Sequence, residues 1–225
     1  MAEQSAAERA YTTIRDDVLE GRRLPGEMLG EASLAADLGV SRTPVRAALV
    51  RLQDEGWIAI YPKRGALVQG MTPEQSAQHA DARLVLETTA AGRVDPARRD
   101  ECADALAATI EAQTEACRAR DARRFIDLVL AFHRGFVVAG GSEVLLELYD
   151  RLADRHRYLL FACGEHLLGR CEEIIDEHRR LIAHLRAGDV EAFADTLRGH
   201  IAESGHLPAE PPSLAGVLAT APPTA

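Results

Sequence analysis

The stretch of sequence that decides the fold is Ser41-Arg42-Thr43-Pro44-Val45-Arg46. It predicts a helix that starts near Arg42, because the hydroxyl of Ser41 can accept a hydrogen bond from a first-turn N–H and Pro44 lies where a missing N–H costs little. Apolar residues then recur at intervals of three and four, in one stripe of Val45, Ala48, Leu49 and Leu52. Arg42, Thr43 and Arg46 therefore project from the N-terminal end of this helix, away from the stripe.

The sequence on both sides of this helix predicts a winged helix-turn-helix. An earlier short helix, about Glu31 to Leu38, ends at Gly39, which suits the tight turn between two crossing helices. A further amphipathic helix lies upstream, with an apolar side made of Tyr11, Ile14, Val18 and Leu19. After Gly56 the pattern changes to two strands, Trp57 to Ile60 and Ala66 to Gln69, as expected for a wing. The tip of this wing carries Lys63, Arg64 and Gly65.

The distribution of charge favours contact with nucleic acid, although the whole chain has a formal net charge of −9. Residues 41–70 hold five basic side chains against two acidic ones, and most of the negative excess lies beyond residue 70. A basic helix end and wing tip on an acidic body would orient the chain on DNA and limit nonspecific binding. Arginine forks suit guanine edges and phosphates. The alternative is that Arg42 and Arg46 belong to a solvated helix face.

Residues 8–70 resemble the DNA-binding domain of the GntR family of bacterial regulators. The matching residues are Ile14, Leu19, Pro25-Gly26, Leu34-Ala35, Gly39-Val40, Ser41 to Arg46, Leu49, Leu52, Gly56 and Gly65. The resemblance implies that the start of the helix meets base edges or phosphates of double-stranded DNA through Arg42, Thr43 and Arg46, with Ser41 beside them. It also implies that Lys63, Arg64 and Gly65 reach the minor groove or the backbone. Some relatives have an arginine where this chain has Ala32, so one contact with DNA is expected to be absent.

The rest of the chain is long enough for a second domain with its own core, since 225 residues exceed one winged helix by about 150. Thr72 can cap a helix that starts at Pro73, and almost no strand pattern follows. Helices are predicted at about 73–91, 96–119, 121–138, 142–163, 165–186 and 189–204. The predicted fold is mainly α, with a winged helix-turn-helix over residues 1–72 and an all-helical bundle over 73–207. Residues 208–225 are rich in proline and alanine and are expected to form a flexible tail.

The sequence predicts a cytoplasmic chain that does not enter a membrane. No segment has the ~18 uninterrupted apolar residues of a membrane span, and the N-terminus lacks the apolar core of a signal peptide. The four cysteines are Cys102, Cys117, Cys163 and Cys171. They lack metal-finger spacing, and the cytoplasm keeps thiols reduced, so ordinary thiols are expected. Redox sensing is the alternative, because Cys163 and Cys171 lie on neighbouring helical segments.

Three histidines lie on or beside the apolar faces of predicted helices. They are His133 next to Phe132, His178 among isoleucines and leucines, and His200 near Phe193 and Leu197. A buried imidazole is costly unless its nitrogens find partners. The three could therefore ligate a metal, meet a polar ligand, or be satisfied separately by their neighbours. Periodicity alone favours separate satisfaction.

The helical part, about residues 74–204, is similar to the effector-binding FCD domain of the FadR-type GntR subfamily. The matching pattern is Arg83-x-x-x-Glu87, Phe132-His133, Glu177-His178, Gly188-Asp189 and His200. The resemblance implies that His133, His178 and His200 hold Zn²⁺ or another divalent metal, and that Arg83 offers its fork to a ligand carboxylate.

This chain departs from that pattern at Val129, where an aspartate normally stands one helical turn before the first histidine. Asp127 cannot substitute on the same face, because the six residues that separate it from His133 correspond to about 600° of helical rotation. Two alternatives follow. The three histidines could hold a metal less tightly, or they could donate hydrogen bonds directly to an anionic ligand.

Several polar neighbours of this site have two interpretations. Arg83 could simply pair with Glu87, four residues on, on an exposed helix. Arg155, Arg157 and Tyr158 could line the same cavity, although their spacing also fits a solvated face. Glu177 is not expected beside the imidazoles, because successive helical residues face directions about 100° apart.

Together these observations predict a homodimeric transcriptional regulator, more often a repressor in this family. Two recognition helices about 34 Å apart would read a near-palindromic operator. A small organic acid in the helical domain would shift the population away from the DNA-binding arrangement. The alternatives are a dedicated metal sensor and a metal-dependent enzyme, since three histidines with an open position can activate water. The enzyme is disfavoured, because the sequence has no general acid or base beside the histidines, no nucleophile motif and no phosphate loop.

Overall fold

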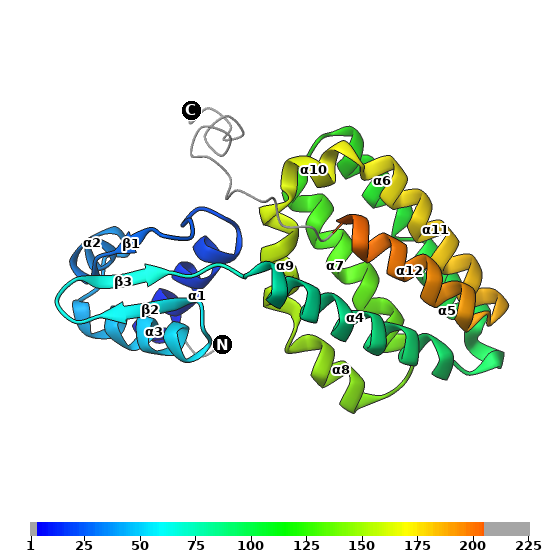
Figure 1. Ribbon diagram of the computed structural model, residues 1–225, viewed down its shortest axis with the longest axis horizontal. Coiled ribbons are helices and arrows are strands. Elements are labelled where there is room, and N and C mark those ends of the chain that lie inside the picture. Colours follow the sequence, from blue (N-terminus) through cyan, green and yellow to red (C-terminus); the bar gives the residue numbers. More distant parts are fainter. Residues whose placement is uncertain (1–3, 205–225) are drawn as a thin grey trace. The chain divides into compact units, whose positions relative to one another are not determined.

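The computed structural model describes residues 4–204, which divide into two compact units between Thr72 and Pro73 (Figure 1). We call residues 4–72 the N-terminal unit and residues 73–204 the helical unit. The predicted fold class is confirmed, since a small antiparallel sheet accompanies three helices in the first unit and the described part of the second holds helices only. The predicted tail at 208–225 lies outside the described residues. Within residues 4–204, no helix combines the length and the apolar character that crossing a membrane requires.

The N-terminal unit packs three helices against a three-stranded sheet. Its elements are α1 (Ala6–Leu19), β1 (Met28–Leu29), α2 (Glu31–Asp37), α3 (Arg42–Asp54), β2 (Ile58–Tyr61) and β3 (Gly65–Val68). The strands pair antiparallel in the order β1-β3-β2 (Figure 1). The stripe predicted for α3 is buried together with Ile14, Leu19 and Trp57. Because α3 packs through this stripe, its opposite face lies at the surface.

Helix α3 begins at Arg42 as predicted, but Ser41 contributes less than expected. Ser41 occupies the N-cap position with an extended backbone, yet its hydroxyl makes no capping hydrogen bond, so that prediction was wrong. The preceding turn already fixes where α3 starts, since Gly39 has a φ of +63° and the N–H of Val40 donates to the carbonyl of Ala35 at 3.0 Å. Pro44 is the third residue of the helix, where an N–H has no partner within the helix in any case.

The two wing strands are each displaced by one residue from their predicted positions. Tyr61 pairs with Gly65, so the hairpin closes around Lys63, whose φ is +64°. Gly65 itself has a φ of +112°, and a Cβ there would clash with the carbonyl oxygen of Leu29 in β1. Glycine is therefore required where the wing passes β1. Strand β1 was not predicted, because two residues are too few to show an alternating pattern.

The helical unit contains nine α-helices in its described residues. They are α4 (Pro73–Arg93), α5 (Arg99–Ala107), α6 (Ile110–Arg118), α7 (Ala122–Ala139), α8 (Glu143–Asp150), α9 (Ala153–Ala162), α10 (Gly164–Gly169), α11 (Cys171–Ala187) and α12 (Val190–Ser204), with a 3-10 turn at Pro96–Arg98 before α5. The predicted helices 96–119, 142–163 and 165–186 are thus each divided. At the divisions the N–H groups of Thr109, Leu152 and Arg170 donate to carbonyls three residues earlier, which bends the chain. No glycine or proline marks the first two bends, so the sequence pattern does not predict them.

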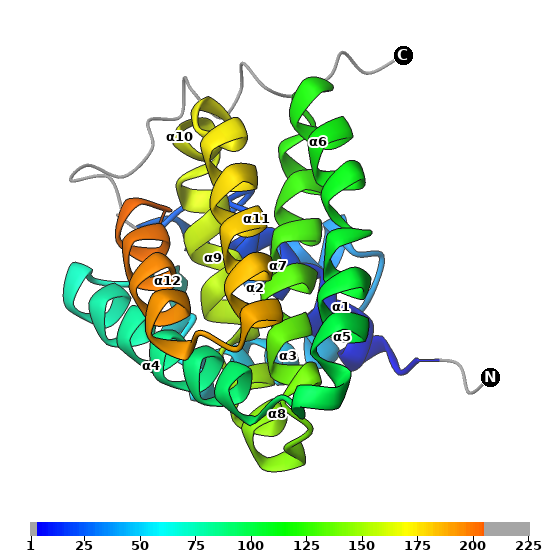
Figure 2. The ribbon, with the colours of Figure 1, turned by 90° about the vertical axis from the view of Figure 1, so that its right-hand side faces the viewer.

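Helix α7 provides the centre of the helical unit. Its Phe125, Phe132 and Phe136 are fully buried, and it contacts α4, α6, α8 and α9. Helix α12 lies between α4 and α11 and contacts both (Figure 2). The end of α7 approaches α4 so closely that a Cβ at Gly140 would lie 2.6 Å from the carbonyl oxygen of Ala90. This contact fixes the C-terminal part of α4 against α7.

A disulfide joins Cys117 at the end of α6 to Cys171 at the start of α11. The expectation of four ordinary thiols was therefore wrong. The pair that the sequence singled out, Cys163 and Cys171, is not the one that is joined. Sequence could not indicate the pairing, because 54 residues separate the bonded cysteines and four cysteines allow three arrangements. Cys102 and Cys163 are both buried and take no part in this bond.

Candidate functional site

The first candidate surface is the N-terminal end of α3. Arg42, Thr43 and Arg46 are exposed there, while Val45 and Leu49 behind them belong to the core. A recognition helix enters the major groove with side chains at its N-terminal end, so this exposure is what such a helix requires. Burial of the two arginines would have excluded the surface.

A carboxylate from the neighbouring helix holds Arg46. Its Nε and Nη2 donate to the two carboxylate oxygens of Glu31, the first residue of α2, at 3.1 and 2.6 Å. The hydrogen bond from Arg46 lowers the pKa of Glu31. The Arg46 side chain is 65 % exposed, so the pair contributes little to stability. A base edge or phosphate that binds the Arg46 guanidinium would have to displace the Glu31 carboxylate from it.

The wing provides the second group of predicted contacts. Lys63 and Arg64 are exposed at its tip, and the N–H of Arg64 donates to the carbonyl of Tyr61 at 3.0 Å. Gly65 is half-buried beside β1. Ala32 is exposed on α2. Every predicted DNA contact therefore lies in the N-terminal unit, on α3 or on the wing.

The second candidate site lies inside the helical unit, where three histidines from different helices meet. His133 on α7, His178 on α11 and His200 on α12 are all buried, and one nitrogen of each lies within 4.8 Å of the others. The sequence placed His133 at the edge of its helix face, but its side chain is fully buried. We call these residues the histidine cluster.

Each imidazole is held through Nδ1 by an oxygen atom. His133 Nδ1 lies 2.7 Å from Glu87 Oε2, His178 Nδ1 lies 2.7 Å from Gln113 Oε1, and His200 Nδ1 lies 2.7 Å from Glu177 Oε2. A proton on Nδ1 can be donated to such an oxygen, which leaves a lone pair on Nε2. Oxygen acceptors of this kind orient histidines that bind metals.

The inward Nε2 atom of His178 lacks a partner, and those of His133 and His200 face each other. His178 Nε2 is buried without a hydrogen-bond partner among the described residues, and such an atom costs about 1–3 kcal/mol. His133 Nε2 lies 3.0 Å from His200 Nε2. Two lone pairs at this distance repel each other unless a proton or a metal ion lies between them. Tetrahedral zinc would separate its nitrogen ligands by about 3.4 Å, so the cluster fits a metal after a small adjustment.

Burial also sets the protonation state of this cluster. Burial lowers the pKa of His133 and of His178 well below the ordinary value, and the positive charge of Arg83 adds to the effect. Both imidazoles are therefore neutral near pH 7, which metal ligation requires.

The carboxylate of Glu87 joins the histidine cluster to α4. It accepts hydrogen bonds from Arg83 Nε at 3.0 Å, His133 at 2.7 Å and the hydroxyl of Tyr149 at 3.2 Å. Burial raises the pKa of Glu87, and Arg83 opposes that shift. The pairing of Arg83 with Glu87 thus exists, but in the interior rather than on an exposed helix. Arg83 Nη2 is buried and lacks a hydrogen-bond partner in the described structure.

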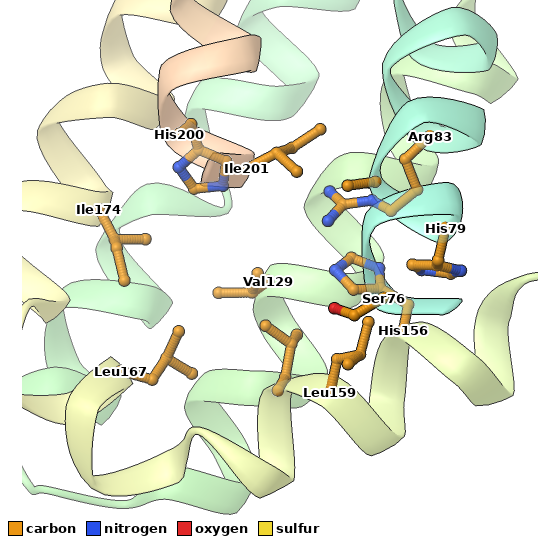
Figure 3. Close-up of a pocket in the computed structure, with 12 residues that line it drawn as sticks. Ser76, His79, Arg83, Val129, His156, Leu159, Leu167, Ile174, His200 and Ile201 are labelled. Carbon is orange, nitrogen blue, oxygen red and sulfur yellow. The ribbon is translucent and has the colours of Figure 1, made fainter. Parts of the chain in front are cut away.

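A small cavity lies beside the histidine cluster (Figure 3). Its polar lining residues are Ser76, His79, Arg83, His156 and His200. Seven apolar side chains complete it, among them Val129, Leu167 and Ile174. The cavity has a volume of about 20 Å³, which is room for about one water molecule. A larger ligand therefore requires the surrounding side chains to move.

Comparison with known proteins identifies the family. The model described as "Bacterial regulatory proteins, gntR family" matches residues 6–68, and the FCD domain model matches residues 78–203. The chain belongs to the GntR family. Regulators of this family bind DNA through the helix-turn-helix and small-molecule effectors through the FCD domain.

Individual relatives agree with this assignment. An uncharacterized HTH-type transcriptional regulator of Streptomyces ambofaciens is 31% identical over 201 residues, which cover 85% of this chain and 80% of the relative. The gluconate operon transcriptional repressor of Bacillus licheniformis is 27% identical over 88% of this chain and 82% of its own. The structure of E. coli McbR/YncC has the same fold, with a TM-score of 0.70 at 22% identity over 89% of this chain and 95% of that one. The relatives are named as regulators and repressors rather than enzymes.

Within this GntR chain, the departure at Val129 has a clear structural setting. Val129 is buried and lines the cavity, at the position where the resemblance places an aspartate. Asp127 instead accepts a hydrogen bond from Arg157 Nη1 at 2.6 Å on the surface. No carboxylate of α7 therefore takes part in the histidine cluster.

Glu177 requires a correction. The angle between successive helical residues predicts that its side chain faces away from the imidazoles, but its carboxylate is 2.7 Å from His200 Nδ1. The argument failed because α12 packs against α11 and brings His200 over to Glu177. Burial alone would raise the pKa of Glu177, but the hydrogen bond from His200 and the charge of Arg170 lower it.

Sequence reasoning missed His79 and His156. His79 precedes Arg83 by one helical turn on α4, and His156 precedes the buried Leu159 and Leu160 on α9 by three and four residues. The same helical spacing that identified the histidine cluster could have indicated His156, whereas His79 lies on a polar face of α4. Arg155, Arg157 and Tyr158, which the sequence offered as cavity residues, are not part of its lining, whereas His156 between them is.

Proposed function

We propose that this chain is a homodimeric repressor whose affinity for a near-palindromic operator falls when a small organic acid binds the helical unit, with Zn²⁺ or another divalent metal held by His133, His178 and His200. The observation that carries the proposal is the unpartnered, buried Nε2 of His178 inside a cluster of three oriented imidazoles. A metal at this place would act as a Lewis acid that binds an anionic ligand.

The charges around the cavity support a carboxylate as the effector. A divalent metal and Arg83 would bring three positive charges, whereas Glu87 and Glu177 each offer one negative charge beside them. A carboxylate would reduce this imbalance and could use the unpartnered Nη2 of Arg83. The name of the Bacillus licheniformis relative refers to gluconate, which is itself a carboxylate.

The size of the cavity supports a link between ligand binding and a change in conformation. A cavity of about 20 Å³ cannot admit an organic acid unless the helices around it move. A ligand that prefers the expanded arrangement shifts the population towards it, and it can weaken DNA binding only by that preference. Helix α4 lines the cavity with Arg83 and begins at Pro73, directly after the last residue of the N-terminal unit.

The proposed DNA contacts follow from exposure and charge. Arg42, Thr43 and Arg46, with Ser41, would meet base edges or phosphates, while Lys63, Arg64 and Gly65 would reach the minor groove or backbone. A symmetric dimer would place two such helices about 34 Å apart. Val85 on α4 and Val144 and Leu148 on α8 are exposed, and α4 contacts α8. Exposed apolar side chains on two neighbouring helices support a dimer contact through the helical unit. A regulator of this kind acts in the cytoplasm, where the chromosome lies.

The proposal is tested on untagged protein by elemental analysis, thermal shift with Zn²⁺ or Ni²⁺, and gel shift on a duplex selected from a random pool. We expect about one metal per chain and a stabilisation by added metal of about 3 kcal/mol at a hundredfold excess over Kd. His178→Ala should abolish both effects. His184→Ala should keep them, since His184 lies on the same helix outside the histidine cluster. An absence of metal together with an absence of thermal shift would reject the metal.

A dedicated metal sensor is the second candidate, favoured by the same histidine cluster. In that case metal alone changes operator affinity, whereas under the main proposal the metal-loaded protein changes affinity only when a carboxylate is added. One gel-shift series with apo protein, metal-loaded protein and metal-loaded protein plus succinate separates the two.

A further inference from the structure

One end of the cavity carries hydrogen-bond donors that the histidine cluster does not use. Ser76, His79 and Arg83 lie on one face of α4, at helical spacing, and His156 faces them from α9. Figure 3 shows the Arg83 side chain and the His156 ring on the same side of the cavity, across from Ile174 and Leu167. His156 is not one of the three residues that meet at the possible metal position. This end of the cavity is therefore distinct from the possible metal position.

Two buried nitrogen atoms at this end lack a partner. His79 Nε2 and Arg83 Nη2 are both buried without a hydrogen bond within residues 4–204, and each residue is 6 % exposed. A guanidinium can only donate, and the Nε2 of a neutral imidazole can donate in one of its tautomers. With the proton of His79 on Nε2, both atoms are donors without a partner, and an acceptor in the cavity would satisfy them.

The electrostatic surroundings favour an acceptor with negative charge. Burial lowers the pKa of His79 to about 4, and the charges of Arg83 and Arg155 add to the effect. Glu87 is the acidic group that opposes them, and its carboxylate already accepts three hydrogen bonds from other residues. An anion entering this end would meet the Arg83 guanidinium and the two imidazoles of His79 and His156, whose pKa values are lowered by burial.

We propose that His79 and His156, together with Arg83, bind the second acidic group of a short dicarboxylate whose first acidic group meets the histidine cluster. This inference rests on the proposed function, because it assumes an acidic effector in the same cavity. His156 and His200 line one small cavity, and the His133 and His156 rings lie 6.0 Å apart. The two ends are therefore close enough for one short dicarboxylate to reach both once the surrounding side chains have moved. His79 and His156 thereby determine which acids the regulator recognises.

The test compares matched acids on the metal-loaded, full-length protein by isothermal titration calorimetry. The dicarboxylates are succinate and glutarate, and the monocarboxylates of equal length are butyrate and pentanoate. We expect the wild-type protein to prefer each dicarboxylate roughly ten-fold, as one charge-assisted hydrogen bond allows. His156→Phe and His79→Gln should each bring this ratio close to one while butyrate binding and metal content stay the same.

His184→Phe serves as the matched control and should keep the preference. A second measurement needs no variant: succinate should shift the side-chain ¹⁵N signals of His79 and His156 in the wild-type protein, and butyrate should shift them less. Equal binding of the paired acids by wild type, or an unchanged ratio in both variants, overturns the subsite and leaves the proposed function intact. A failure of both kinds of acid to bind rejects the acidic effector itself, and the subsite with it.

Discussion

The two units place their functional side chains in opposite settings. In the N-terminal unit, Arg42, Thr43 and Arg46 stand at the surface on a helix whose core face is wholly apolar. In the helical unit, His133, His178 and Glu87 are themselves part of the core. Function and stability are therefore separable in the first unit and coupled in the second. Substitutions of surface residues should alter binding alone, whereas changes in the interior should alter both.

The largest effect should come from the disulfide between Cys117 and Cys171. Reduction should lower the free energy of unfolding of the helical unit by up to about 4 kcal/mol, because the bond closes a loop of 54 residues. Thermal unfolding followed by circular dichroism reports this unit, which contains most of the helix. Trp57, the single tryptophan, reports the N-terminal unit by fluorescence and should show no change.

The control for that measurement is the Cys117→Ala/Cys171→Ala double variant, which should unfold at the same temperature with or without dithiothreitol. A shift of the Trp57 transition on reduction would contradict the independence of the two units, because it would show that they unfold together.

Acid should destabilise the helical unit by the next largest amount. Burial lowers the pKa of His79 from 6.5 to about 4. Between these two values the unfolded chain binds a proton on His79 that the folded chain does not bind. The free energy of unfolding that neutral His79 contributes is fully present above pH 6.5 and is lost as the pH falls towards 4. By pH 4.5 His79 alone should cost about 2–3 kcal/mol. Urea unfolding at pH 7.5 and 4.5 should show a smaller loss for His79→Gln than for wild type.

The N-terminal unit should not lose stability through histidine protonation in acid, since residues 1–72 contain no histidine. An equal acid loss in wild type and His79→Gln would remove His79 as its cause.

Substitution of Arg46, a surface residue of the N-terminal unit, should change DNA binding without changing stability. Arg46→Ala should weaken operator binding by ~1–3 kcal/mol if the side chain contacts a base, while both unfolding transitions stay in place. The fluorescence anisotropy of a labelled duplex measures the first quantity. Arg98→Ala removes the same charge from an exposed position of the helical unit and should leave operator binding unchanged. If Arg46→Ala binds as wild type does, Arg46 does not read the operator.

The smallest effect is expected at Glu31. Glu31→Gln should raise DNA affinity two- to five-fold, or less than about 1 kcal/mol, because it frees Arg46 and removes a negative charge near the phosphates. The same anisotropy titration at two salt concentrations measures it. Weaker binding by Glu31→Gln would show instead that the carboxylate orients Arg46 for the groove.

The difference between the units also explains what the sequence could predict. The winged helix-turn-helix follows from local patterns, namely the apolar stripe of α3, the turn at Gly39 and the strands around the wing tip. The histidine cluster was found because His178 and His200 interrupt apolar faces. His79 was missed because the buried face of α4 is polar, with Ser76, Arg83 and Glu87, and so looks like a solvated one.

The sequence could not predict which residues hydrogen-bond to the imidazoles, because these residues lie on other helices and come beside the imidazoles only after packing. Gln113 holds His178 because α6 packs against α11, and Glu177 holds His200 because α12 packs against α11. Helix packing of this kind is a property of the tertiary structure. The disulfide has the same origin, since Cys117 and Cys171 are brought together by the contact between α6 and α11.

The contact of Gly140 with Ala90 holds the C-terminal part of α4 close to α7. The cavity residue Arg83 lies about 10 Å from Ala90 along α4, and Pro73 lies about 25 Å from it. If an effector tilted α4 about Ala90, Pro73 would move about 2.4 times as far as Arg83. Under the proposed function, a small displacement at the cavity would then be larger at the residue where the chain passes to the other unit.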